Sequence, residues 1–110
     1  MMNKDEVLYV VRSWVDPEHG QPYMDWLENK HMAEVLAEPG VAWARKALLD
    51  QTDENGWSSC LLLYGFEDRA ALDTYMKSDA RDRFWVQLEE MKDIHYSDRF
   101  WGDVDFALDG

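Results

Sequence analysis

Residues 41–66 read VAWARKALLDQTDENGWSSCLLLYGF, and this stretch decides the fold. Two apolar segments flank the polar sequence QTDENG, whose Asn55–Gly56 pair is typical of a tight turn. A turn between two such segments predicts a β-hairpin, so residues 41–49 and 57–66 are expected to pair as antiparallel strands.

The sequence before the hairpin predicts one strand and one helix. Residues 6–15 (EVLYVVRSWV) are β-branched and aromatic, which favours a strand. Pro22 suits the first turn of a helix, where its missing N–H costs nothing, and this helix is expected to run to about Ala37. Pro39–Gly40 then ends it.

The sequence after the hairpin predicts two helical pieces and a last strand. Asp68 can cap a helix that runs through Lys77, and Ser78–Asp79 can cap another that runs to about Lys92. Residues 94–106 alternate in polarity and predict a final strand. The order is β-α-β-β-α-β with the second helix broken in two. This order predicts an α+β, ferredoxin-like fold: an antiparallel sheet with helices on one face.

Composition limits the class of protein. The chain has 110 residues, of which 46% are hydrophobic, so we expect one packed domain that spans residues 1–110. The 23 Asp and Glu residues outnumber 11 Lys and Arg, and the net charge of −12 disfavours nucleic acid and anionic membranes as partners. No apolar run approaches the roughly 18 residues of a membrane span.

Two further features predict a cytoplasmic location. The opening MMNKDEVLYVV reads poorly as a signal peptide and better as the approach to a first strand. Cys60 is the only cysteine, which excludes a disulfide within the chain and favours a reducing compartment.

The strands are apolar on both faces. In residues 57–66, Cys60, Leu62 and Tyr64 alternate with Leu61 and Leu63, so neither row is polar. Helices on one side cover only one row. We therefore expect the other row to meet a second copy of the chain, which gives a homodimer of two packed sheets.

The first helix carries the strongest functional signal. At 100° per residue, His31 lies in the middle of an apolar stripe and faces the sheet. The stripe contains Tyr23, Met24, Leu27, Glu34 and Val35. His31 is either a core histidine with a hydrogen-bond partner or a general base or hydrogen-bond donor in a cavity. Glu34 is close enough to orient its ring or raise its pKa.

The same helix resembles a known superfamily. The segment YMDWLENKHMAEVLAEPGV contains Trp26–Leu27, His31, Val35–Leu36 and the Pro39–Gly40 exit. It is similar to the first helix of the dimeric α/β-barrel superfamily, and most similar to EthD-like and uncharacterised small members. The superfamily includes cofactor-free monooxygenases, isomerases and polyketide cyclases. The resemblance implies a pocket that contains His31.

Other side chains are candidates for the wall of such a pocket. Tyr9 and Tyr64 have apolar neighbours of the same parity, and their phenols either bind a substrate oxygen or form hydrogen bonds within the core. Apolar substrate contacts are expected from Met24, Leu27, Leu62 and Trp85, with Glu34 beside them. His95 and Arg99 begin the last strand and are expected at the rim.

We expect neither a metal nor another cofactor. His31 and Glu34 share a helix face and make a two-ligand pair, but His19 and His95 are scattered and no Cys/His spacing typical of zinc occurs. One titratable group in an apolar cavity suits proton transfer, which predicts an isomerase, cyclase or monooxygenase acting on an aromatic or polyketide-like compound. The alternatives are a non-catalytic small-molecule-binding or accessory protein and a structural dimer with His31 in its core.

Overall fold

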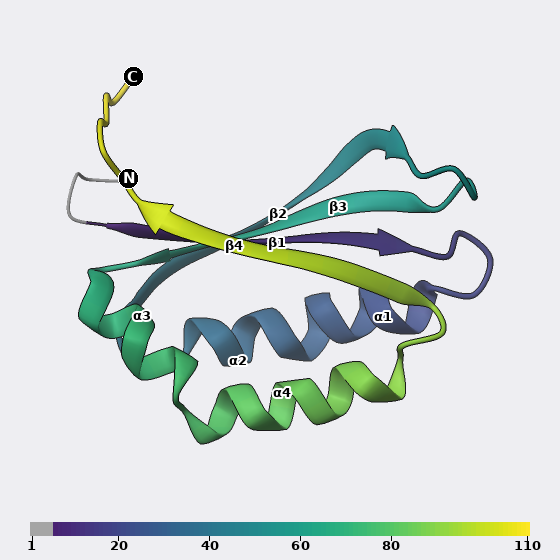
Figure 1. Cartoon of the computed structure of the whole chain (residues 1–110), viewed down its shortest axis with the longest axis horizontal. Helices are drawn as coiled ribbons and strands as arrows, with labels where there is room; N and C mark the ends of the chain where they lie inside the picture. Colours follow the sequence, from purple (N-terminus) through teal and green to yellow (C-terminus); the bar gives the residue numbers. More distant parts are fainter. Residues whose placement is uncertain (1–5) are drawn as a thin grey trace.

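The computed structural model describes residues 6–110 (Figure 1). Residues 1–5, with which the expected domain and the MMNKD opening begin, lie outside the described residues. The elements, in chain order, are β1 (Val7–Val15), α1 (Gln21–Trp26), the π-helical turn η1 (Leu27–His31), α2 (Met32–Leu36), β2 (Val41–Thr52), β3 (Ser58–Phe66), α3 (Arg69–Met76), α4 (Asp79–Glu90) and β4 (His95–Asp103). This confirms the predicted order, including the break between α3 and α4.

The four strands form an antiparallel sheet in the order β2-β3-β1-β4. All helices lie on one face of it, with the α1–α2 segment and α4 side by side beneath the strands (Figure 1). Strand β1 is central, and its Tyr9 pairs with Tyr64 on β3 and Trp101 on β4. Because side chains alternate along a strand, these three residues face the same side of the sheet.

The first helical segment contains a wider turn that the sequence analysis does not predict. The Met32 N–H donates to the Leu27 carbonyl five residues back, which makes Leu27–His31 a π-helical turn. The buried side chains of this segment, Tyr23, Leu27, His31 and Val35, recur at a strict four-residue spacing. Such a spacing drifts around an α-helix of about 3.6 residues per turn. The wider turn compensates for the drift and keeps His31 facing the sheet.

The predicted helix boundaries have clear local causes. Gly40 ends the first helical segment with φ of 82°, and a side chain there would meet the Ala71 Cβ at 2.3 Å. The Asp68 carboxylate accepts a hydrogen bond from the Ala71 N–H, and the Ser78 hydroxyl accepts one from the Arg81 N–H. These contacts confirm Asp68 and Ser78 as the caps of α3 and α4.

The sheet has one covered face and one open face. The row Cys60, Leu62, Tyr64 and Phe66 of β3 is buried beneath the helices. The alternate row, with Leu61 and Leu63, faces away and is half-buried. We call this side the open face; its other apolar side chains include Leu8, Val10, Trp14, Trp43 and Phe100, the last 52% exposed. Within residues 6–110, no helix has the length and apolar character to cross a membrane.

Candidate functional site

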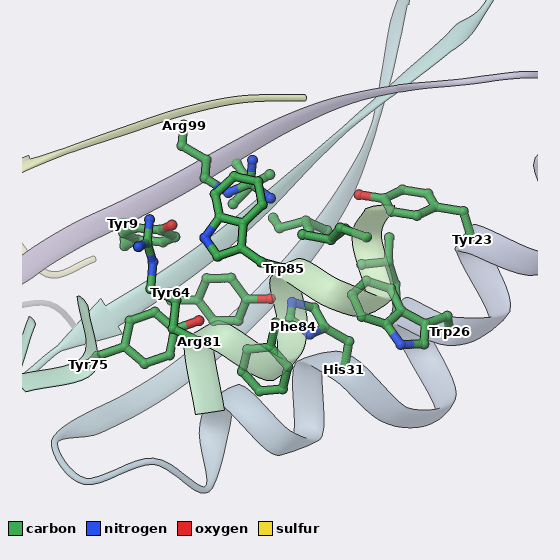
Figure 2. A pocket seen from close by; sticks show the side chains of 14 residues that line it. Tyr9, Tyr23, Trp26, His31, Tyr64, Tyr75, Arg81, Phe84, Trp85 and Arg99 are labelled. Carbon is green, nitrogen blue, oxygen red and sulfur yellow. The ribbon is translucent and has the colours of Figure 1, made fainter. Parts of the chain in front are cut away.

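A pocket lies between the covered face of the sheet and the two long helical segments (Figure 2). Of the residues predicted for the site, its lining contains Tyr9, Leu27, His31, Leu62, Tyr64 and Trp85. The remaining lining residues are Val11, Tyr23, Trp26, Tyr75, Arg81, Phe84, Leu88 and Arg99. The side chains leave about 20 Å³ of free space, room for about one water molecule. A larger ligand therefore requires some of these side chains to move.

His31 is held by two aromatic rings. The Trp26 indole stacks on the imidazole with 4.1 Å between ring centroids and 12° between planes. The Phe84 ring meets it edge-on at 4.5 Å and 89°. His31 is only 8% exposed. The π-helical turn and these two rings thus fix the imidazole at the bottom of the pocket.

Two buried polar atoms of the pocket lack a hydrogen-bond partner. Within residues 6–110, the His31 Nδ1 and the Tyr64 hydroxyl both lie buried without a protein partner. Figure 2 shows the Tyr64 hydroxyl pointing toward the His31 ring from the opposite wall. Buried polar groups are almost always paired in folded proteins. These two atoms are therefore free to bind a ligand that enters the pocket.

Burial sets the protonation states of the site. It lowers the pKa of His31 to about 4, because desolvation disfavours the imidazolium. The Glu34 carboxylate raises this pKa, as the sequence predicts, but more weakly than burial lowers it. Burial also raises the pKa of Tyr64 and Tyr75. At neutral pH the site combines a neutral imidazole with protonated phenols.

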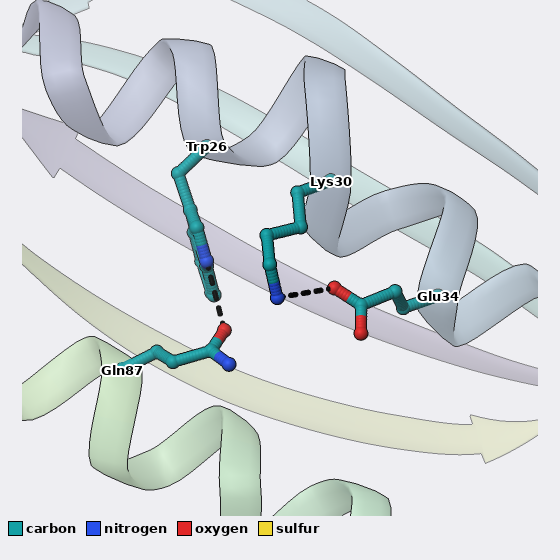
Figure 3. Close-up of polar contacts among 4 residues, drawn as sticks. All are labelled: Trp26, Lys30, Glu34 and Gln87. Atoms are coloured by element: carbon teal, nitrogen blue, oxygen red, sulfur yellow. Dashed lines mark hydrogen bonds and ion pairs between the residues drawn. The ribbon is translucent and has the colours of Figure 1, made fainter.

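The ring that holds His31 is itself tied to α4. The Trp26 Nε1 donates a hydrogen bond of 2.9 Å to the Gln87 Oε1 (Figure 3). This bond joins the first helical segment to α4 next to the pocket. It therefore sets the position of the indole against which the imidazole stacks.

Glu34 and Met24 lie outside the pocket, contrary to the sequence analysis. The Glu34 carboxylate pairs with Lys30 at 2.8 Å on the outer side of the helix (Figure 3). Met24 lines a separate groove with Leu48 and Cys60. Tyr23, the residue before Met24, takes the inward position instead, because its hydroxyl forms a 2.6 Å hydrogen bond with Ser13.

Two polar residues of the pocket, Tyr75 and Arg81, are missing from the sequence prediction, and a third, Arg99, is predicted only for the rim. Tyr75 on α3 and Arg81 on α4 line it, and Arg99 lines it from β4 rather than standing only at the rim. A signal for Arg81 is present in the sequence. It shares the helical spacing of Phe84, Trp85 and Leu88, a stripe that faces one side of a helix.

A second polar cluster beside the pocket is fully paired. The Ser13 hydroxyl lies 2.6 Å from the Tyr23 hydroxyl and 2.9 Å from the Ser97 hydroxyl. Tyr23 stacks on His95 at 4.0 Å, and the His95 Nδ1 donates to the Met91 carbonyl at 2.8 Å. Burial lowers the pKa of His95 as well. This cluster stabilises the fold, since its internal hydrogen bonds occupy these groups.

The part of the chain that the structure describes contains no cluster of side chains that could bind a metal ion. No three His, Cys, Asp or Glu side chains there are grouped closely enough to hold an ion. His31 and Glu34 point to different surroundings, so they do not form the two-ligand pair that their spacing allows.

The fold and the position of the pocket define a class. A four-stranded antiparallel sheet with helices on one face is a ferredoxin-like fold, and solved structures of an EthD family protein and of monooxygenase-type proteins share it. The chain belongs to the family described as a domain of unknown function, DUF4286, whose model matches residues 6–101. The comparison with curated proteins gave no match.

Solved structures share this fold at low sequence identity. SnoaB, a cofactor-independent oxygenase from Streptomyces nogalater, is 20% identical, with a TM-score of 0.64 over 94% of this chain and 97% of that one. An EthD family protein from Bacillus halodurans is 14% identical, with a TM-score of 0.63 over 88% and 97%. A candidate antibiotic biosynthesis monooxygenase from Bacteroides thetaiotaomicron is 17% identical, with a TM-score of 0.60 over 96% and 93%. At these identities the likeness establishes the fold.

Proposed function

We propose that the chain is a small enzyme that acts without a bound cofactor on an apolar, aromatic or polyketide-like compound, with His31 as the acid/base group. The observation that carries this proposal is the buried His31 Nδ1, which has no partner within residues 6–110. A histidine kept only for packing would be expected to have one. The description of SnoaB as a cofactor-independent oxygenase on the same fold supports the same kind of chemistry.

The chemistry that suits this site is proton abstraction. The neutral imidazole accepts a proton from a C–H or O–H group next to a carbonyl or phenol of the substrate, and the electron pair stays on the substrate as an enolate or phenolate. The Tyr64 hydroxyl, protonated and unpartnered, donates a hydrogen bond to the resulting oxyanion. The anion also raises the pKa of the adjacent imidazole, which favours proton transfer. Isomerisation, cyclisation or oxygenation by dioxygen can follow.

The ligand is expected to contact the apolar wall of the pocket. Tyr9, Leu27, Leu62 and Trp85 supply this wall in the proposal, and Met24 and Glu34 take no part because they lie outside it. Trp85 is the side chain best placed to move, since it is 45% exposed. Its displacement opens the narrow free space to a larger molecule.

We further propose a cytoplasmic homodimer in which the single domain pairs through its open face. The apolar row with Leu61 and Leu63 supports this assembly, because a sheet face of this kind is rarely left in water. The lone cysteine supports the reducing compartment: Cys60 is buried in β3, and burial raises the pKa of its thiol.

A second function is favoured by the small size of the free space. A pocket of about 20 Å³ that opens only on binding also fits a non-catalytic binding or accessory protein. Native mass spectrometry of the purified protein identifies a retained compound, and incubation of that compound with fresh protein then separates the two functions. Chemical conversion by wild type and not by His31→Gln supports the enzyme. Tight binding by both without conversion contradicts it and supports the binding protein.

A further inference from the structure

Two arginines flank the tryptophan at the outer side of the pocket. The guanidinium carbon of Arg99, on β4, lies 4.7 Å from the centroid of the Trp85 ring, and that of Arg81, on α4, lies 5.6 Å from it (Figure 2). Both side chains are half-buried and line the pocket. None of the ion pairs or side-chain hydrogen bonds found within residues 6–110 involves Arg81 or Arg99 as a side-chain donor.

The pocket is positively charged in an acidic protein. The chain has 23 Asp and Glu residues against 11 Lys and Arg, yet the pocket lining contains these two arginines and no carboxylate. Burial raises the pKa of Tyr23, Tyr64 and Tyr75, and the charge of Arg99 opposes this rise at each of them. Burial has the larger effect, so these phenols stay neutral and do not balance the arginines.

Half-buried guanidinium groups without a counter-ion are costly, because burial removes water that would solvate them. Trp85 compensates in part through cation–π contacts, which are weak at exposed sites. A carboxylate would compensate far better, since the planar guanidinium donates paired hydrogen bonds to its two oxygens. The arrangement thus favours a bound anion.

We propose that the pocket binds an aromatic acid, with its carboxylate between Arg81 and Arg99 and its ring directed toward His31. This inference rests on the proposed function for the use of the pocket and adds the charge of the substrate. The acid group anchors the ligand at the outer side, and the aromatic body takes the space that Trp85 now fills. Tyr64 and His31 then meet the far end of the ring, where the proton is transferred.

A groove beside the pocket offers a route by which the ligand meets Arg99 first and His31 last. A groove of about 280 Å³ runs between α4 and β4, and Trp85, Leu88 and Arg99 line both this groove and the pocket. A ligand in the groove therefore meets Arg99 before it reaches the interior. Its carboxylate replaces the indole at the guanidinium and so favours the outward movement of Trp85.

Isothermal titration calorimetry with a matched pair of probes tests the proposal. The probes are 2-naphthoate and 2-naphthamide, which have the same shape and differ in charge. Wild type is expected to bind 2-naphthoate about 10- to 100-fold more tightly than 2-naphthamide, because the carboxylate gains charge-assisted hydrogen bonds to the arginines. Arg99→Gln and Arg81→Gln should each reduce this preference, because they weaken 2-naphthoate binding more than 2-naphthamide binding.

The control is Arg83→Gln, which removes the same charge from an exposed position of α4 outside the pocket. It should keep the full preference. Equal binding of the two probes by wild type overturns the anion subsite and leaves the pocket and its proposed chemistry standing. Binding of neither probe overturns the subsite together with the use of this pocket for aromatic compounds. If Arg99→Gln does not fold, as judged by circular dichroism, Arg81→Gln decides the outcome.

Discussion

At the scale of single residues, two buried histidines differ in one hydrogen bond. His95 is stacked and buried, and its Nδ1 donates to a backbone carbonyl. His31 is equally buried and equally stacked, but its Nδ1 has no partner in the described chain. The His31 ring lines the pocket, whereas the His95 ring stacks on Tyr23, which lines it. The missing hydrogen bond is thus the difference that supports the acid/base role we propose for His31.

His31→Gln tests this role directly. Glutamine keeps the approximate volume and a hydrogen-bonding group but has no basic nitrogen that titrates near neutral pH. The activity toward an identified substrate should fall by about 10²–10⁴-fold, the usual contribution of a general base, while the far-ultraviolet circular dichroism stays unchanged. His19→Gln, at an exposed position, is the matched control and should retain activity. Full activity of His31→Gln would exclude the acid/base role.

The low pKa of His31 also makes stability depend on pH. The pKa of about 4 in the folded state is below the ordinary imidazole value of 6.5, so between these values the unfolded chain binds more protons. The contribution of His31 to the unfolding free energy is complete above pH 6.5 and is lost as the pH falls toward 4. The total loss is about 3 kcal/mol, since one pKa unit corresponds to about 1.4 kcal/mol.

Urea unfolding of wild type and His31→Gln at several pH values measures this contribution. The unfolding free energy of wild type minus that of His31→Gln should fall as the pH decreases from 7 to 4, because only wild type has an imidazole that gains a proton on unfolding. All other side chains are the same in both proteins, so their contributions cancel in the difference. A difference that stays constant over this range would show that His31 is not held neutral by the fold.

At the scale of elements, the helix ends follow from the sequence and the inner geometry of the first helix does not. Pro22, Asp68 and Ser78 act on the backbone within a few residues, so their effect can be predicted locally. The π-helical turn depends on which face the rest of the protein covers. An apolar stripe at four-residue spacing is compatible with a regular α-helix or with one that contains a π-helical turn. Only packing against the sheet determines which side is buried.

The hydrogen bond between Trp26 and Gln87 connects the first helical segment to α4, and its contribution to the unfolding free energy can be measured. Gln87→Leu leaves the half-buried indole N–H without its acceptor, which should lower the unfolding free energy by about 1 kcal/mol. Glu34→Gln is the control, because it breaks an exposed helical ion pair and should cost no more than about 0.5 kcal/mol. Urea unfolding compares the two. An equal or smaller loss in Gln87→Leu would show that this bond does not hold α4 against the first helical segment.

At the scale of the whole molecule, the sequence predicts the architecture and leaves part of the site open. Alternation along β4 places His95 and Arg99 on the same face, but parity alone does not say which face the helices cover. The pairing of Val11 with Arg99, next to that of Tyr9 with Trp101, brings the guanidinium into the pocket. A register between strands distant in the sequence comes from tertiary packing, and one sequence considered by itself gives no signal for it.

The same parity, once the structure has fixed it, sharpens the expectation of a dimer. Leu61 belongs to the open face and pairs across the sheet with Arg12 and Ala47, whereas Leu62 lies buried under the helices. Burial of apolar surface stabilises by about 25 cal/mol per Å², so two copies gain by packing their open faces together in a closed two-fold dimer. An aspartate at Leu61 would place a charge in that interface, while one at Leu62 would disrupt the core of each subunit.

Sedimentation equilibrium at micromolar concentration measures the assembly. Wild type should have twice the mass of the 13.0 kDa chain, and Leu61→Asp should be monomeric or insoluble because its charge cannot be desolvated in the interface. Val86→Asp makes the same change on the outer side of α4, at a residue 63% exposed, and should stay a soluble dimer. A stable, soluble wild-type monomer would contradict the pairing of open faces. The apolar side chains of that face would then have to tolerate water, and the His31 pocket would have to work within one copy of the chain.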